Sequence, residues 1–331
     1  MTPALAAPLF VASIAVMLLA SAQFAQRLDH VGLRLGLPEA LLGLLTALAA
    51  DAPEISSAIS ALVQGDHSVA VGVVVGSNAF NLAAMLGLSA VVTARVRARH
   101  ETLELEAFVG LWLLAVMLAV AAGGLGATTG AVLVAAVVVP YVALLAAGRR
   151  LARRLPQAES RFLRRSFGEP HRPDRTLPSR PEAAGVLAVL LLALVLIVAG
   201  SVGAVRAATD LAARWSVPEE LVGVIVLAIL TSLPNAWTGV RFGLQQRGSA
   251  LMSETLNSNS INVVAGLAVP AALGSFGAFS GLAIFDLAWL LAMTAAALFL
   301  FGRRNGAGRG AGGFLVALYA VFLVVQIVAR V

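Results

Sequence analysis

Residues 50–57, ADAPEISS, place two carboxylates, Asp51 and Glu54, on either side of Pro53 in the middle of an apolar segment. The flanking sequences, LPEALLGLLTALA at 37–49 and AISALV at 58–63, have the composition of a membrane-spanning helix. An ionised carboxylate is costly within hydrocarbon, and a proline removes an intrahelical hydrogen bond. Both are tolerated at that depth only where the chain is buried in protein or faces ions or water. The segment therefore indicates a functional break in a membrane helix.

The composition of the whole chain is that of a membrane protein. Of its 331 residues, 60% are hydrophobic and 12% are charged, and the mean hydropathy is +0.92. Soluble globular domains carry about 25% charged residues. Apolar runs long enough to cross about 30 Å of hydrocarbon recur along the chain, without the period-two alternation of barrel strands. The sequence predicts an all-α polytopic membrane protein with ten transmembrane helices, at roughly 5–26, 37–63, 68–92, 104–122, 126–148, 183–204, 217–245, 250–274, 280–301 and 313–330.

Residue types that are missing, or that are confined to loops, narrow the range of functions. There is no cysteine, which excludes disulfides, thiolate chemistry and cysteine-ligated metals. All 23 basic residues are arginines, most of them in loops and without an aromatic-rich basic patch, so no nucleic-acid partner is expected. No P-loop is present, so direct coupling to ATP is not expected. Membrane lipid is an expected partner, with no cofactor expected and with the oligomeric state left open.

The distribution of the arginines predicts the orientation in the membrane. One side of the predicted bundle carries little beyond Arg206, Arg214 and Arg330. Because arginine is enriched in cytoplasmic loops, we expect the other side, with the basic segment 149–182, in the cytoplasm. Both termini are then outside, in a multi-pass protein of the cell inner membrane. The arginine-rich side holds Arg27, Arg34, Arg95, Arg97, Arg99, the ten arginines of 149–180, Arg247, Arg303, Arg304 and Arg309.

The chain contains an internal repeat. VGLRLGLPEALLG at 31–43 matches LAARWSVPEELVG at 211–223 with five identities. Further along each copy, GSNAFN at 76–81 matches NSNSIN at 257–262. These polar residues recur at matching places within apolar spans, where shared hydrophobicity does not account for them.

The repeat divides the chain into two halves of opposite orientation. Each half holds five predicted spans, and because that number is odd the second half enters the membrane from the opposite side. This is the inverted-repeat plan of secondary transporters, in which interrupted helices surround a site near the midplane. Pro53 and Pro234 supply such interruptions at matching positions. The predicted division is a repeat-one half at 1–148, a basic linker at 149–182 and a repeat-two half at 183–331.

GLLTALAADAPE followed by GSNAFN, repeated as GVIVLAILTSLPN followed by NSNSIN, resembles the two alpha-repeats of the sodium/calcium exchanger family, within the calcium/cation antiporter superfamily. The usual pattern of that family is a G-T-S-x-P-E segment and a G-S-N-x-x-N or G-S-N-x-x-D segment in each half. The resemblance covers nearly the whole chain outside the linker. It implies a cation site at the centre of the membrane, with ligands from Glu54, Ser77 and Asn81 in the first repeat and Thr231, Ser232 and Ser258 in the second.

The chemistry of these residue types agrees with that implication. Ser77 and Asn81 lie four residues apart and share a helical face, with Asn78 beside them. Neutral oxygens of this kind suit hard cations such as Ca²⁺. Small and amide residues also serve the packing of one membrane helix against another, and both roles are compatible.

Departures from the family pattern change the charge of the expected site. In the second repeat Asn235 stands where a second glutamate is expected, and Asn262 where many members have aspartate. In the first repeat Ala50 and Asp51 replace the threonine and the serine. Asp51 and Glu54 together can hold one Ca²⁺, or two H⁺ or two Na⁺ in its place. Adjacent carboxylates repel one another when both are charged, which favours proton coupling. Asp51, Asn235 and Asn262 are therefore included among the expected ligands.

The remaining acidic residues have less specific interpretations. Glu254 lies one turn before Ser258, and faces either the pathway or a solvated mouth at the cytoplasmic end. The others are expected at the membrane interface or at helix N-termini, where acids are favourable; they are Asp286, Glu101, Glu104 and Glu106.

The sequence thus predicts a secondary active cation antiporter that exchanges Ca²⁺ for H⁺ or Na⁺ by alternating access through a midplane site. The resemblance implies that the first and sixth spans slide against the remaining bundle. A monovalent cation/proton antiporter stays open as an alternative, as does a degenerate non-transporting or channel-like homologue, since Asn235 replaces an acid. An intramembrane enzyme is disfavoured because the sequence lacks a second catalytic aspartate in a glycine-rich motif and the histidine motifs of metalloproteases.

Overall fold

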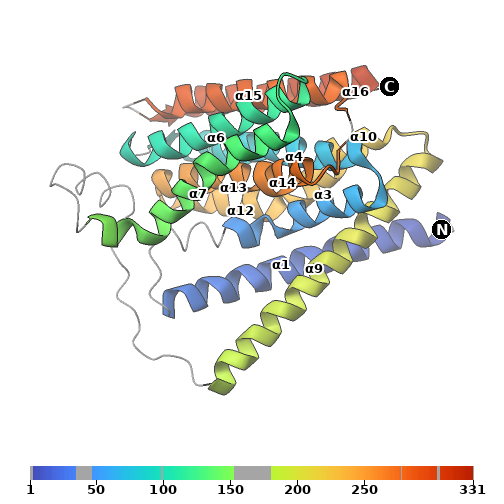
Figure 1. The fold of residues 1–331 in the computed structure, drawn as a ribbon, viewed down its shortest axis with the longest axis horizontal. Helices are drawn as coiled ribbons and strands as arrows, with labels where there is room; N and C mark the ends of the chain where they lie inside the picture. Colours follow the sequence, from blue (N-terminus) through green and yellow to red (C-terminus); the bar gives the residue numbers. More distant parts are fainter. Residues whose placement is uncertain are drawn as a thin grey trace.

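The computed structural model describes residues 3–34, 47–97, 100–152, 180–276, 278–303 and 306–330, and within them the chain is almost wholly helical (Figure 1). The α-helices are α1 (Pro3–Arg34), α3 (Ala52–Gln64), α4 (His67–Asn81), α5 (Ser89–Thr93), α6 (His100–Ala121), α7 (Ala127–Ala152), α9 (Arg180–Arg214), α10 (Glu219–Leu221), α11 (Ala228–Thr231), α12 (Leu233–Leu244), α13 (Gly248–Val263), α14 (Val269–Ala272), α15 (Gly281–Phe301) and α16 (Arg309–Arg330). The π-helical segments are η1 (Leu82–Leu88), η2 (Val222–Leu227) and η3 (Val264–Ala268), and strands β1 (Arg95–Val96) and β2 (Ala307–Gly308) pair antiparallel.

Membrane-spanning helices account for most of the described chain. Seven are long and apolar enough to cross a membrane, at Leu5–Leu28, His67–Thr93, Leu103–Ala121, Ala127–Leu145, Gly185–Arg214, Gly281–Phe301 and Arg309–Arg330. A further candidate is bent by 47° between Glu219–Thr231 and Leu233–Leu244. Of the other two predicted spans, 250–274 corresponds to α13, η3 and α14, and 37–63 begins in residues that the structure does not describe. The prediction of an all-α polytopic membrane protein is confirmed.

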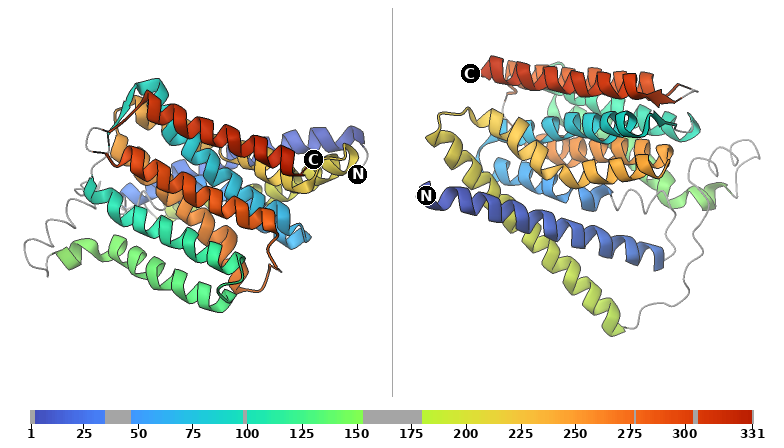
Figure 2. Two further views of the ribbon diagram at one scale, coloured as in Figure 1. Left: turned by 90° about the horizontal axis from the view of Figure 1, so that it is seen from above. Right: turned by 180° about the vertical axis from the view of Figure 1, so that it is seen from behind.

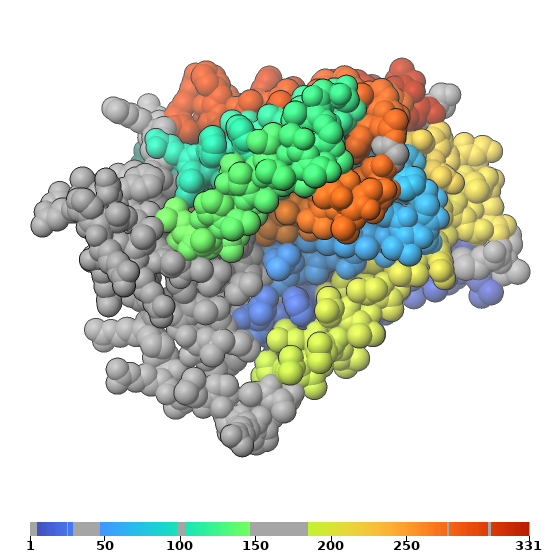
Figure 3. All heavy atoms as spheres, in the orientation of Figure 1, coloured from blue at the N-terminus to red at the C-terminus, as the bar shows by residue number. Residues whose placement is uncertain are grey.

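Most of the helices run along a common direction in a layered bundle, and the long helix α9 slants across α1 (Figures 1 and 2). α1 and α9 pack along each other at one face, and α15 and α16 lie at the opposite face. The helices α3, α4, α12 and α13, which carry the repeated polar motifs, lie between these pairs. In the space-filling view, α7, α14 and α9 cover the near face (Figure 3). Apolar helices therefore enclose the polar ones.

The two ends of the chain lie at the same end of the bundle (Figure 1). Both termini lie at one end of the bundle, whereas α7 ends and α9 begins toward the other end (Figure 1). The β1–β2 pair joins the segments that follow α5 and α15, at that second end. The end of α7, the start of α9 and the β1–β2 pair therefore lie opposite the termini (Figure 1). Most of the predicted linker, at 153–179, lies outside the described residues, as do Arg99 and Arg304.

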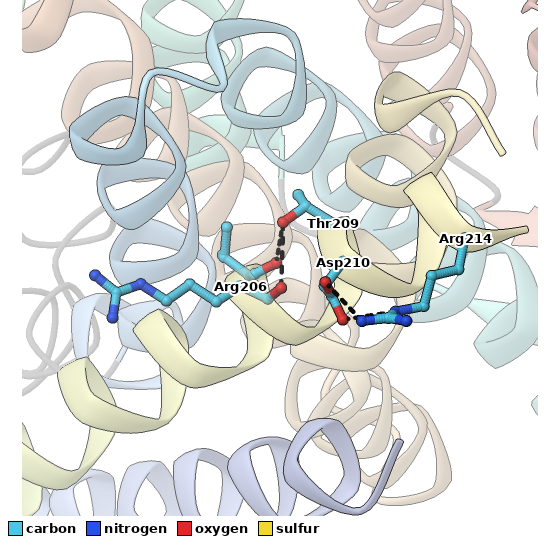
Figure 4. Close-up of polar contacts among 5 residues, drawn as sticks. Arg206, Thr209, Asp210 and Arg214 are labelled. Atoms are coloured by element: carbon cyan, nitrogen blue, oxygen red, sulfur yellow. Dashed lines mark hydrogen bonds and ion pairs between the residues drawn. The ribbon is translucent and has the colours of Figure 1, made fainter. Parts of the chain in front are cut away.

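The last turns of α9 carry a local polar cluster (Figure 4). Arg214 Nε donates to Asp210 Oδ2 at 2.9 Å, and Thr209 Oγ1 donates to the carbonyl oxygen of Val205 at 3.1 Å. An arginine in the last turn also interacts favourably with the helix dipole. The side chains of the ion pair are partly exposed, and such pairs contribute little to stability. The cluster marks the end of the long helix α9.

Glycines bring the two halves into backbone contact. α4, from the first half, packs on η2 and α11, from the second. A Cβ atom at Gly223 would lie 2.9 Å from Val69 Cα, and one at Gly76 would lie 2.8 Å from Ala228 Cβ. Carbon atoms in contact are normally about 3.5–4.0 Å apart. Glycine at these positions therefore allows the close approach that places GSNAFN beside the second repeat.

Gly76→Ala is expected to destabilise the folded protein by about 1–3 kcal/mol, because the added methyl group overpacks this contact. The measurement is the melting temperature of the purified protein in detergent. Gly185→Ala in α9 is the matched control, since a Cβ there meets no atom within 4 Å and alanine is the better helix former. A Gly76→Ala protein that melts at or above the control temperature would contradict so tight a contact.

Candidate functional site

The two proline breaks have the same backbone geometry. Asp51 precedes α3 with φ −82° and ψ −3°, and Ser232 precedes α12 with φ −88° and ψ 2°. A proline follows in the first turn of each helix, where its missing N–H costs little. Because Pro53 cannot bond the carbonyl of Ala49, the hydroxyl of Ser21 in α1 donates to that oxygen at 3.2 Å. The breaks thus turn polar groups inward, and in the first copy the freed carbonyl keeps a partner.

An asparagine from the second half bridges two carboxylates of the first. Asn235 Nδ2 donates to Asp51 Oδ1 at 2.7 Å and to Glu54 Oε1 at 3.2 Å. The hydroxyl of Ser258 donates to the same Asp51 oxygen at 2.6 Å. Each of these four residues is at most 1% exposed. Asn235, which replaces the expected second glutamate, therefore contacts Asp51, the acid that the first repeat has in addition to Glu54.

Asparagines join α4 to α13 beside the carboxylates. Asn81 Nδ2 donates to Ser258 Oγ at 3.1 Å and to Asn259 Oδ1 at 3.3 Å. The side-chain amides of Asn78 and Asn259 each donate to the other residue's main-chain carbonyl, at 3.0 and 3.1 Å. Asn262 Nδ2 donates to Asn78 Oδ1 at 3.1 Å. These reciprocal bonds hold GSNAFN and NSNSIN face to face.

Several side-chain oxygens in this network are buried without a hydrogen-bond donor. They include Asp51 Oδ2, Glu54 Oε2, Asn81 Oδ1 and Asn262 Oδ1. A buried acceptor without a donor costs about 1–3 kcal/mol. Within the described ranges, the arginine ion pairs reach neither Asp51 nor Glu54. Carboxylate and amide oxygens are the ligands that hard cations prefer, so the network offers acceptors that a cation would satisfy.

The three hydroxyls that the resemblance implies differ in their surroundings. The hydroxyl of Ser232 lies beside the Glu54 carboxyl group. The hydroxyls of Ser77 and Thr231 donate to main-chain carbonyl oxygens of their own helices, at 3.1 and 2.9 Å. All three are fully buried. A hydroxyl that donates to its helix still presents lone pairs to the interior.

The structure brings most of the predicted site residues into one hydrogen-bonded network, which contains Asp51, Glu54, Asn81, Asn235, Ser258 and, through Asn78, Asn262. Sequence reasoning missed Asn259, although it is the last residue of the NSN triplet at 257–259, the position that Asn78 holds in the GSN triplet at 76–78. Their contact has a sequence separation of 181 residues. Only the alignment of the two copies could have indicated it.

Glu106 was expected at the membrane interface or at a helix N-terminus, and its side chain is buried inside the protein. It is 8% exposed and accepts hydrogen bonds from Ser253 and Asn257 of α13. Glu254, between these two residues, is partly buried and lies within electrostatic range of Glu106 and Asp51. The burial arises because α13 packs over α6. Polar residues at four-residue spacing on α13 were the available signal.

The side chain of Asp286 is also buried inside the protein. It is 1% exposed and accepts hydrogen bonds from Arg330 at 2.7 Å and Gln326 at 2.6 Å. Both partners lie on α16, four residues apart, so the next helix along the chain compensates the charge. Glu104 is exposed as expected, and the side chain of Glu101 lies outside the described part of the chain.

Comparisons with known proteins place these features in context. A family model described as sodium/calcium exchanger protein matches residues 5–146 and 185–328. Among solved structures, the sodium-calcium exchanger NCX_Mj is 18% identical, with a TM-score of 0.65 over 98% of this chain and 99% of that chain. The H⁺/Ca²⁺ exchanger CAX is 15% identical, with a TM-score of 0.75 over 96% of this chain and 82% of that chain. Among curated protein sequences, no match was found.

Proposed function

Because the chain belongs to the sodium/calcium exchanger protein family, we propose that it is a secondary active antiporter that exchanges Ca²⁺ for a monovalent cation across a membrane. The family model matches one segment in each half, which confirms the predicted resemblance and the two-repeat layout. Membership of this family makes the chain a transporter and not an enzyme, as the sequence predicted. The counter-ion and the ligand roles are proposed from the site itself.

The observation that carries the proposal is the pair of buried carboxylates, Asp51 and Glu54, bridged by the Asn235 amide. A cation between them would replace that amide's partial positive charge with a full one. Ca²⁺ neutralises both carboxylates and takes additional neutral oxygens. We propose Asp51, Glu54, Asn81, Asn235, Ser258 and Asn262 as ligands, with further oxygens from Ser77, Thr231 and Ser232.

Two protons are the counter-ions that this charge pattern favours. Exchange of one Ca²⁺ for two H⁺ keeps the pair Asp51 and Glu54 neutral in both loaded states. Three sodium ions would carry one positive charge more than Asp51 and Glu54 balance, so a third carboxylate such as Glu254, one turn before Ser258, would have to take part. NCX_Mj and CAX are named for different counter-ions, so the shared fold does not choose between Na⁺ and H⁺.

Alternating access is proposed to use α1 and α9 as one sliding pair. A Cβ atom at Gly200 of α9 would lie 2.9 Å from Met17 Cβ of α1, and Ser201 donates to the sulfur of Met17 at 3.2 Å. The pair is thus closely packed within itself. Only a neutralised site crosses readily, because bare carboxylates are costly at membrane depth. This difference couples the two ions without ATP.

We propose that the chain resides in the cell inner membrane with both termini outside and residues 149–182 in the cytoplasm. The arginine distribution supports this orientation. The common end of the two termini in the bundle is compatible with it (Figure 1).

Flux into proteoliposomes tests the proposed exchange. Ca²⁺ uptake is expected when the lumen is more acidic than the bath, and it should stop when an ionophore collapses the pH difference. Uptake that follows a Na⁺ gradient instead would keep antiport and change the counter-ion. Monovalent cation uptake without Ca²⁺ transport would favour a monovalent cation/proton antiporter. A cation leak that does not depend on any gradient of a second ion would favour a channel. No flux of any tested cation would contradict transport.

A further inference from the structure

A second buried carboxylate lies outside the proposed cation site. The Oε1 atom of Glu106 accepts hydrogen bonds from Ser253 and from Asn257, the latter at 3.4 Å. Its Oε2 atom is buried without a donor. The hydroxyl of Tyr141 in α7 donates to Asn257 Oδ1 at 2.7 Å. Three helices, α6, α7 and α13, therefore build this polar cluster, and the exchange proposed above gives it no role.

Glu254 connects this cluster with the cation site. It lies one turn before Ser258 on α13, about 6 Å along the helix axis, and within electrostatic range of both Asp51 and Glu106. α13 begins at Gly248, which lies against the main chain of Arg97, next to β1. From the end of the bundle where β1 lies, Glu106 and Glu254 therefore come first, and Asp51 lies further toward the cation site.

Few charged groups surround the two carboxylates. Glu106 faces Tyr141 from α7 and Glu254 from α13, and Glu254 faces Asp51 and Glu106. The segments η3 and α15 also pack on α6, and α4 and α12 pack on α13; their described residues supply no charged group that interacts with either carboxylate. The arginine ion pairs found in the described ranges involve neither.

The one unpartnered oxygen of Glu106 suits a proton and not a metal ion. Ser253 and Asn257 present O–H and N–H donors to Oε1, and the amide oxygen of Asn257 is occupied by Tyr141. One unpartnered carboxylate oxygen is left, whereas Ca²⁺ takes about 6–8 oxygens. For a buried carboxylate without a cation, binding a proton removes the charge and with it the free-energy cost of burying that charge.

We propose that Glu106 and Glu254 form a proton relay that loads Asp51 and Glu54 from the end of the bundle where β1 and β2 pair. This inference rests on the proposed antiport and adds the route of its counter-ion. Glu106 takes up a proton from solvent, and Glu254 receives it and passes it to Asp51. Each donor becomes a charged carboxylate until it is protonated again, and the transfers run in reverse when the site releases protons.

Two flux assays on one set of variants test the relay. Glu106→Gln and Glu254→Gln are compared with Glu104→Gln, the matched control, whose side chain is exposed two residues away on α6. The first assay is Ca²⁺ uptake driven by a pH difference, and the second is isotopic Ca²⁺ exchange at equal pH, which needs no proton. We expect both relay variants to lose about tenfold or more of the first and to keep the second within about twofold of wild type.

The outcomes separate the relay from the antiport itself. Unchanged pH-driven uptake in Glu106→Gln and Glu254→Gln would overturn the relay, and so would an equal loss in both assays, which indicates a structural role. Wild-type protein that shows isotopic Ca²⁺ exchange but no pH-driven uptake would overturn the relay and leave Ca²⁺ antiport standing. Wild-type protein without isotopic exchange would remove the proposed function on which the relay rests.

Discussion

Glu54→Gln is expected to lower gradient-driven Ca²⁺ uptake by about 100-fold or more. Glu54 is fully buried, with Oε1 bonded to Asn235 and Oε2 without a donor. Glutamine keeps the shape of the side chain and removes one of the two charges that Ca²⁺ would neutralise. Breaking a buried charge pair costs about 3–5 kcal/mol, and each 1.4 kcal/mol is about a factor of ten. The measurement is the initial rate of uptake into proteoliposomes.

An exposed glutamate provides the control for this variant. Glu219 lies at the start of α10 and its side chain is exposed, so Glu219→Gln should transport at close to the wild-type rate. Both proteins should elute as single species in detergent, which shows that each is folded. Wild-type uptake by Glu54→Gln would remove Glu54 from the proposed ligand set.

Exchanging Asp51 with Asn235 is expected to recover transport that the single change Asp51→Asn lowers. Asp51→Asn leaves one carboxylate and should lower uptake by about tenfold or more, since part of the cost of a broken buried pair applies again. Asn235 Nδ2 donates to Asp51 Oδ1 at 2.7 Å, so the double variant Asp51→Asn with Asn235→Asp returns one acid and one amide to the same contact. We expect its uptake within about tenfold of wild type, because the total charge is unchanged.

The single changes make the exchange experiment decisive. Asn235→Asp alone adds a carboxylate beside Asp51 and Glu54. Its Ca²⁺ uptake should reach a maximum at a smaller pH difference than in the wild type, or should be absent. A double variant no better than Asp51→Asn would show that the position of the acid matters more than the sum of charges. If Asp51→Ser leaves both the rate and its pH dependence unchanged, Asp51 is not a site residue.

The sequence was sufficient for the helical class and for the polar motifs, because both depend on local signals. Apolar runs of membrane length identify spans without knowledge of their neighbours. The repeated motifs also indicated which spans meet. The direct contact of Asp51 with Asn235 joins residues 184 positions apart, and it was not deduced, because the alignment of the repeats pairs Asn235 with Glu54 and not with Asp51.

Burial of the other acids could not be deduced from their own segments. Glu106 and Asp286 lie near the beginnings of apolar helices, where an acid normally meets solvent. Their depth depends on α13 and α16, which pack over them and supply the partners. The directions of individual side chains could not be predicted from the sequence either. The hydroxyls of Ser77 and Thr231, for example, donate to main-chain carbonyls of their own helices.

The contact between Asp51 and Asn235 bears on how a duplicated gene diverges. The two copies of the motif meet at one point, so at the proposed site a carboxylate contributed by either copy would act on the same cation. Selection then acts on the charge of the assembled pocket and not on each copy by itself. An acid lost from one copy can be offset by an acid gained at a non-equivalent position in the other. Relatives of this chain are therefore better compared by the summed acidity of both motifs than residue by residue.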